Sequence, residues 1–124
     1  MSKSIILADD NRRVRQSLSI CLEMLGGWVL VGEAQNGWEA LDLCTHLQPD
    51  VVIMDLIMPV MDGVTATRLI HEQYPNIKIL VLTSTLDQAD IQAALDAGAT
   101  EVLLKYGTMD KIEVALRKTF SVDS

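Results

Sequence analysis

The chain has 124 residues, of which 49% are hydrophobic, so its length allows one domain and its composition predicts a packed core. Ten Lys and Arg stand against seventeen Asp and Glu, and the formal net charge of −7 repels nucleic acid and anionic lipid surfaces. Two Trp, two Tyr and one Phe are too few for the stacking platform of a single-strand binder. The composition therefore argues against nucleic-acid or membrane binding by this chain alone.

No segment has the features of a membrane span or an export signal. No apolar run approaches the roughly 20 residues that cross a bilayer, and the apolar start at residues 4–8 is too short for a signal peptide. We therefore expect a cytoplasmic protein. Cys21 and Cys44 fall in separate helical patterns, which favours reduced core residues over a disulfide or a metal pair.

Apolar runs and helical patterns alternate along the chain. In order, the sequence predicts a strand at 5–8, a helix over 14–25, a strand at 28–32, a helix marked by Leu41, Cys44 and Leu47, a strand at 51–54, a helix over 64–74, a strand at 77–82, a helix over 88–97, a strand at 101–104 and a helix over 109–120. Runs 5–8 and 51–54 are continuously apolar and run 77–82 is apolar apart from Lys78, as in strands buried on both faces.

Five repeats of strand then helix predict parallel strands joined by right-handed crossovers, with helices on both faces. The fold class is therefore a doubly wound α/β sandwich over residues 1–120. Residues 121–124 are polar, and we interpret them as a tail or the start of a linker.

Polar residues stand where the predicted strands end. In an open doubly wound sheet, ligands bind beyond the carboxyl ends of the strands. The residues at those ends are Asp9, Asp10, Asp55, Thr83, Ser84 and Lys105. A lone Asp10 would most simply be a helix N-cap, but the joint pattern predicts three carboxylates, a hydroxyl and an ammonium in one crevice.

Three carboxylates in a crevice repel one another, and a cation would relieve that repulsion. Oxygen ligands suit Mg²⁺, which proteins hold by one or two carboxylates together with phosphate oxygens of a substrate. Zinc is disfavoured because no His or Cys stands at a strand end, and His46 and His71 fall on predicted helices among polar neighbours. Lys105 and the hydroxyl of Thr83 would complete a pocket for a phosphoryl group.

At these residues the sequence resembles the receiver domain of bacterial two-component response regulators. The motifs that carry the resemblance are Ala8-Asp9-Asp10, the stretch 49–59 around Asp55, Met61-Asp62-Gly63 and Leu82-Thr83-Ser84. Residues 31–34 and 80–84 further resemble the LuxR/NarL-type subfamily, in which a receiver controls a carboxyl-terminal helix-turn-helix that is absent here. The resemblance implies a flavodoxin-like five-stranded parallel sheet of order 2-1-3-4-5.

The resemblance also implies roles for individual residues. Asp55 would accept a phosphoryl group from the phosphohistidine of a sensor histidine kinase. Asp10, Asp55 and the backbone carbonyl of Ile57 would bind Mg²⁺ directly, and Asp9 would bind it through water. Thr83, Ser84 and Lys105 would bind the phosphoryl group and respond to it. The only reactions would be this self-phosphorylation and a slow self-dephosphorylation, so the chain is not expected to be an enzyme with turnover.

Two positions depart from the family pattern. The switch position three residues before Lys105 is usually aromatic, but here it is Val102, and Lys105 is followed by Tyr106 where the family often has Pro. A cis bond before a non-proline residue costs about 3–4 kcal/mol, and the sequence does not decide the isomer. The resemblance also implies that Ile57 and Thr85 border the approach of water to the phosphoryl group. Neither residue is acidic or amide-bearing, which predicts slow self-dephosphorylation.

Phosphorylation-dependent self-association is a further expectation from the subfamily. Ile20 and Met24 on the first helix and Val114 on the last lie off the buried stripes. A dimer could use the first and fifth helices, or the fourth helix and fifth strand. Equally, scattered apolar side chains on a surface need no partner.

Three other functions stay open at the level of sequence. A haloacid-dehalogenase-type phosphatase would need an acid and base two residues after the nucleophile, where this chain has Ile57. A flavodoxin-like FMN carrier would need a phosphate loop after the first strand, where Asp9-Asp10-Asn11 repels phosphate. A receiver-like scaffold that no longer accepts phosphate is suggested by Val102 and Tyr106, although the complete set of strand-end residues argues against it.

Overall fold

Strands and helices alternate along the whole chain in the computed structural model, which describes residues 2–85, 87–105 and 109–120. The strands are β1 (Lys3–Ala8), β2 (Trp28–Ala34), β3 (Val51–Asp55), β4 (Lys78–Thr83) and β5 (Glu101–Leu104). The helices are α1 (Arg12–Leu25), α2 (Gly37–Leu47), α3 (Gly63–Gln73), α4 (Gln88–Ala97) and α5 (Met109–Phe120).

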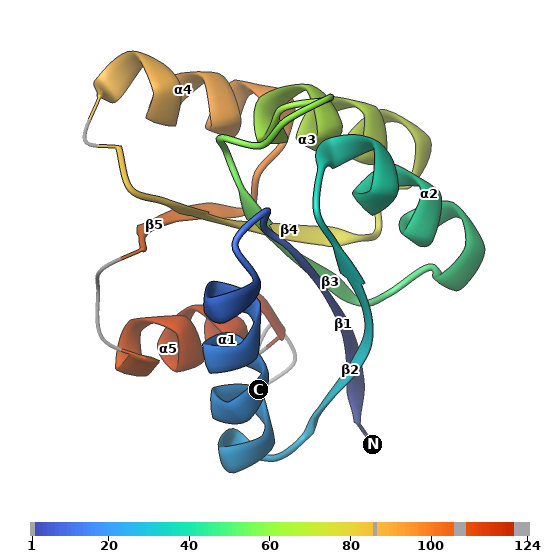
Figure 1. Ribbon diagram of the computed structural model, residues 1–124, viewed down its shortest axis with the longest axis vertical. Helices are drawn as coiled ribbons and strands as arrows, with labels where there is room; N and C mark the ends of the chain where they lie inside the picture. Colours follow the sequence, from blue (N-terminus) through green and yellow to red (C-terminus); the bar gives the residue numbers. More distant parts are fainter. Residues whose placement is uncertain (1, 86, 106–108, 121–124) are drawn as a thin grey trace.

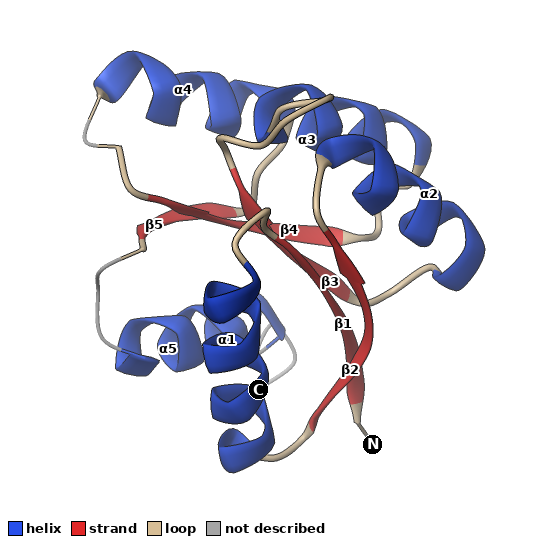
Figure 2. Ribbon diagram, in the orientation of Figure 1, coloured by secondary structure: helices blue, strands red, loops and turns tan. Residues whose placement is uncertain are grey.

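The strands form one parallel sheet in the order β2-β1-β3-β4-β5. Helices α2, α3 and α4 cover one face of the sheet, and α1 and α5 cover the other (Figures 1 and 2). The predicted doubly wound sandwich and its strand order are confirmed. None of the helices in the described ranges has the length and apolar character needed to cross a membrane.

Alternate side chains of the central strands enter two separate cores. On β1, Ile6 and Ala8 pack on the side of α2, α3 and α4, whereas Ile5 and Leu7 pack on the side of α1 and α5. All four of these side chains are almost completely buried. The apolar runs of the sequence therefore correspond to strands of a sheet that is covered by helices on both faces, as expected.

The edge of the sheet differs from its centre. On β2, exposure alternates along the strand, and Val29 and Val31 are exposed. This edge strand also shifts register against β1 between Leu30 and Gly32, so that Val31 has no paired residue. The strand continues to Ala34, two residues beyond the predicted end. Leu47, which we expected on the buried stripe of α2, is instead 46% exposed. It lies against Gly32 of the edge strand, which has no side chain to cover it.

Polar side chains cap the N-termini of four helices. Asn11, Asn36, Asp62 and Asp87 each accept backbone N–H bonds from the first turn of α1, α2, α3 and α4. Asp10 is therefore not the cap of α1, since Asn11 has that role. The Asp10 carboxylate is left exposed to solvent beside the end of β1.

Candidate functional site

Three carboxylates meet at the carboxyl ends of β1 and β3. Oxygen atoms of Asp9, Asp10 and Asp55 all lie within 4.8 Å of one another, and among the described residues this is the one such group of three acidic, His or Cys side chains. Asp55 is the last residue of β3, and Asp9 and Asp10 follow directly after β1. Asp9 and Asp55 are buried, whereas Asp10 is exposed. The predicted convergence of these three residues is present.

Lys105 reaches the same point from the end of β5. Its Nζ lies 2.7 Å from Oδ2 of Asp9 and 3.3 Å from Oδ2 of Asp55. Its backbone N–H donates to the carbonyl of Thr83 at 2.7 Å, which holds the residue against the end of β4. The lysine side chain is only 16% exposed, so its charge acts in a partly desolvated site.

The electrostatics of the site favour a cation at Asp55 and a charged lysine. Burial and the neighbouring Asp9 raise the pKa of Asp55, while the charge and hydrogen bond of Lys105 and a backbone N–H of Ile57 lower it, and the net shift is upward. Burial lowers the pKa of Lys105, but its hydrogen bond to Asp9 and the charges of both aspartates raise that pKa by more, so the net shift is upward. Lys105 therefore stays protonated at neutral pH.

Thr83 is the last residue of β4 and Ser84 follows it, and their side chains have different surroundings. Thr83 is completely buried, and its Oγ1 accepts the N–H of Thr85 at 3.1 Å. Ser84 is exposed, and with Lys105, Asn11 and Leu82 it lines a groove on the side of α1 and α5. The structure thus places Thr83 and Ser84 at the predicted edge of the sheet, although no hydrogen bond joins either hydroxyl to a carboxylate of the cluster within the described ranges.

A second groove, on the other side, is lined by the two residues expected to control dephosphorylation. Ile57 and Thr85 both line it, together with Asp62 and Asp90. The side chain of Ile57 is 65% exposed, so it is not held in the core. Thr85 is partly buried, and its hydroxyl accepts the N–H of Asp87 at 3.0 Å.

The loop between β3 and α3 closes tightly on the end of β3. Gly63 donates its N–H to the carbonyl of Leu56 at 2.8 Å, and a Cβ at Gly63 would lie 2.0 Å from the carbonyl oxygen of Asp55. The start of α2 also contacts this loop, since Gly37 donates its N–H to Met61 at 2.8 Å. Val60 lies within the loop at φ +69°.

Sequence reasoning did not single out Arg15, which lies directly behind the acidic cluster. Its guanidinium is buried on α1 and bonds the backbone carbonyl of Asp9 and the carboxylate of Glu33. A signal was available in the sequence: Arg15 stands three residues before Leu18 and seven before Leu22, on the stripe that faces the sheet. A charge on such a stripe needs a buried partner.

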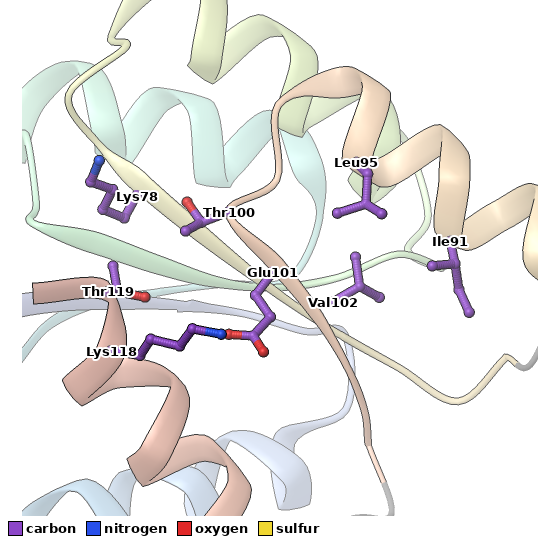
Figure 3. Close-up of a pocket in the computed structure, with 8 residues that line it drawn as sticks. All are labelled: Lys78, Ile91, Leu95, Thr100, Glu101, Val102, Lys118 and Thr119. Carbon is purple, nitrogen blue, oxygen red and sulfur yellow. The ribbon is translucent and has the colours of Figure 1, made fainter.

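Val102, which we expected to be the switch position, is not among the residues of the acidic cluster. Val102 is partly buried and lines a groove of about 470 Å³ together with Ile91 and Leu95 of α4. Figure 3 shows these three side chains pointing toward one another, with Lys118 and Glu101 at the other end of the groove. Tyr106 and residues 121–124 lie outside the described residues.

The remaining sequence predictions concern cysteines and histidines. Cys21 and Cys44 are free, Cys44 is fully buried and Cys21 half-buried. Burial raises the pKa of Cys44 to about 12. His46 and His71 are both exposed on helices, as expected.

Comparison with known proteins identifies the family of this chain. The family model of the response regulator receiver domain matches residues 5–117. The response regulator protein VraR of Staphylococcus saprophyticus is 36% identical over 124 residues, which are 100% of this chain and 59% of VraR. The chain thus spans about three-fifths of that relative's length.

Solved structures show the same likeness. A two-component response regulator of the LuxR family from an Aurantimonas species has a TM-score of 0.92 and 30% identity, over 98% of this chain and 86% of that one. RcsB from Salmonella enterica serovar Typhimurium, bound to promoter rprA in the presence of phosphomimetic BeF3−, has a TM-score of 0.84 and 30% identity, over 93% of this chain and 66% of that one.

The chain belongs to the response regulator receiver domains, and its similarities are to members of the LuxR/NarL type. It is a receiver domain of a two-component response regulator. Membership in this family sets aside both the phosphatase and the FMN carrier.

Proposed function

We propose that Asp55 accepts a phosphoryl group from the phosphohistidine of a sensor histidine kinase, in the presence of Mg²⁺. The observation that carries this proposal is the meeting of Asp9, Asp10, Asp55 and Lys105 at one edge of the sheet. Phosphoryl transfer demands positioning and charge stabilisation more than covalent chemistry from the protein, and four charged groups held by three strand ends supply both.

The proposed step forms one bond and breaks one. A carboxylate oxygen of Asp55 attacks phosphorus, the phosphorus–nitrogen bond of the phosphohistidine breaks, and the imidazole leaves with its electron pair. Lys105, already 3.3 Å from Oδ2 of Asp55, is placed to pair with a phosphoryl oxygen in the product. Thr83 and Ser84 at the end of β4 are the hydroxyls proposed to respond to that group.

The donor set fits a hard divalent cation. Three carboxylates within 4.8 Å of one another are all oxygen ligands, and no described His or Cys joins them. We assign direct ligation to Asp10, Asp55 and the carbonyl of Ile57, and a water-mediated contact to Asp9. Bound there, Mg²⁺ would neutralise charge on the oxygens of the transferring phosphoryl group.

A thermal titration tests the metal part of the proposal. A ligand that binds only the folded protein stabilises it by mass action, so millimolar Mg²⁺ should raise the Tm at neutral pH. Asp10→Ala should shrink that rise, and Glu72→Ala, which removes an exposed carboxylate on α3, should leave it unchanged. A wild-type melting curve that Mg²⁺ does not move would contradict the metal site and favour a scaffold that accepts no phosphate.

The signal would pass to a DNA-binding output domain outside this chain. RcsB, 30% identical, was solved bound to promoter DNA in the presence of a phosphomimetic, and we propose that phosphorylation of this receiver controls its output domain. The receiver would act by self-association, without touching DNA itself. Ile20 and Met24 of α1 and Val114 of α5 are 59%, 80% and 62% exposed, and α1 and α5 cover the same face of the sheet (Figure 1).

Light scattering with and without beryllofluoride and Mg²⁺ measures this self-association. We expect a larger mass with the phosphoryl mimic bound, and a return to the monomer mass in Met24→Glu, which places a charge on the exposed patch. A monomer under both conditions would show that this domain does not dimerise alone.

A further inference from the structure

The buried face of α1 carries the guanidinium of Arg15 at a position where most helices have an apolar side chain. Arg15 is 8% exposed and shares that face with Leu18 and Leu22. Burying a charge costs free energy unless it is paired and hydrogen-bonded. The partners of Arg15 therefore indicate why an arginine is present.

Those partners are the ends of two strands. Nη1 of Arg15 donates to the backbone carbonyl of Asp9 at 2.5 Å, and Nε donates to Oε1 of Glu33 on β2 at 3.0 Å. The planar guanidinium offers donors in a fixed fork, so one side chain holds both acceptors at once. Glu33 in turn limits the orientations that the guanidinium can take.

With this bond, every polar group of Asp9 has a partner. Its N–H donates to the carbonyl of Ala34 at 3.0 Å, Oδ1 accepts the N–H of Asn11 at 2.8 Å, and Oδ2 accepts Lys105 at 2.7 Å. Arg15 supplies the fourth contact, on the carbonyl. Because a peptide unit is planar, holding this carbonyl also fixes the plane of the peptide that leads into Asp10.

The carboxylate of Asp10 has no hydrogen-bond partner of its own among the described residues, and the side chain is exposed. Its place within 4.8 Å of the other two carboxylates is therefore set by its own backbone. Arg15 is the side chain that holds the peptide just before it.

We propose that Arg15, oriented by Glu33, is a positioning residue for Mg²⁺ binding: by holding the Asp9 carbonyl it keeps the Asp10 carboxylate where the ion needs it. This inference rests on the proposed Mg²⁺-dependent function of the site. Partners that orient metal ligands commonly change metal affinity by 10–100-fold when removed.

The sign of the effect separates positioning from simple electrostatics. A nearby cation repels Mg²⁺, so loss of the Arg15 charge alone would tighten Mg²⁺ binding. Loss of a positioning contact would weaken it. The two roles thus predict opposite changes in the Mg²⁺ dissociation constant.

The test is isothermal titration of Mg²⁺ into the wild type, Arg15→Met, Arg15→Lys and Arg12→Met, at a temperature where circular dichroism shows each folded. Arg12→Met is the matched control, because it removes the same charge from an exposed position on the same helix. We expect dissociation constants about tenfold higher for both Arg15 variants and within about twofold of wild type for Arg12→Met. Arg15→Lys keeps the charge without the fork, and serves alone if Arg15→Met unfolds.

A readout without metal accompanies the titration. Amide hydrogen exchange at Asn11, whose N–H is bonded to Asp9, should be faster in the Arg15 variants than in Arg12→Met. Arg15 variants that bind Mg²⁺ as tightly as the wild type, or more tightly, overturn the inference and leave the proposed function standing. A wild type that binds no Mg²⁺ contradicts the proposed function, and unchanged exchange at Asn11 then overturns the inference separately.

Discussion

Val60 carries the strained backbone of the loop that follows the candidate phosphoacceptor. Its φ is +69°, and the N–H of Met61 donates across it to the carbonyl of Pro59 at 2.7 Å. A β-branched residue in this region costs on the order of 1–3 kcal/mol, and the side chain is 85% exposed, so little packing offsets the cost.

We therefore expect Val60→Gly to raise the free energy of unfolding by about 1 kcal/mol, because glycine adopts positive φ without a Cβ penalty. Urea denaturation measures the change. A glycine variant less stable than the wild type would show that the loop is not strained at this residue.

Ile57 and Thr85 are expected to set the lifetime of the phosphorylated state. Both line the groove beside the cluster, and neither side chain can hold an attacking water as an amide or carboxylate could. The double variant Ile57→Asn, Thr85→Glu should lose phosphate several-fold faster than the wild type, on the order of tenfold for an added positioning or general-base group. Loss of phosphate is followed by intact mass over time, and a double variant no faster than the wild type would contradict the shielding role of Ile57.

The acidic and basic residues of the site were predictable from sequence, because parallel strands bring their carboxyl ends to one edge. Asp9, Asp55 and Lys105 needed no more than that rule. Arg15 was not predicted, because its partners are a backbone carbonyl and a residue 18 positions away on β2, and no local pattern gives such a pairing. The complete burial of Thr83 was not predicted either, because it depends on the side chains that pack around β4.

At the scale of elements, the sequence predicted α4, α5 and β5 with the observed bounds. Strong local signals mark such bounds: in α4, Asp87 caps the N-terminus and Gly98 caps the C-terminus. The end of β2 and the exposure of Leu47 were predicted wrongly, because both depend on β2 being the sheet edge. The strand order that places β2 at the edge was implied by the family resemblance, and helical periodicity does not show where on a helix the cover of the sheet ends.

Gly63, the first residue of α3, lies directly against the end of β3. A Cβ there would lie 2.0 Å from the carbonyl oxygen of Asp55 and 2.7 Å from Cα of Leu56, so backbone would have to move. We expect Gly63→Ala to lower the free energy of unfolding by about 3 kcal/mol, at the upper end of typical overpacking costs, as measured by urea denaturation.

Gly32→Ala is the control for that substitution. The nearest atoms to its Cβ would be the ends of the Leu43 and Leu47 side chains, at 3.3 to 3.6 Å, and these can rotate away. Its cost should stay below about 1 kcal/mol. Equal losses in the two variants would mean that the close approach of α3 to β3 is not what makes Gly63 necessary.

At the scale of the whole molecule, the sheet divides the domain into a side with α2, α3 and α4 and a side with α1 and α5 (Figure 2). The acidic cluster lies at the strand ends between these layers, with one groove on each side of it. Lys105 lines the groove on the side of α1 and α5, and Ile57 lines the groove on the other side. A phosphoryl group at Asp55 would thus lie next to residues that line both grooves.

The central claim is that Asp55 accepts a phosphoryl group with the help of Mg²⁺. The most direct measurement is the intact mass of the protein before and after incubation with acetyl phosphate, with Mg²⁺ and with a chelator, for the wild type and for Asp55→Ala. The account predicts that the wild type gains the mass of one phosphoryl group only when Mg²⁺ is present, and that Asp55→Ala gains none. A wild type that gains no mass with Mg²⁺, or an Asp55→Ala variant that gains as much, would contradict it.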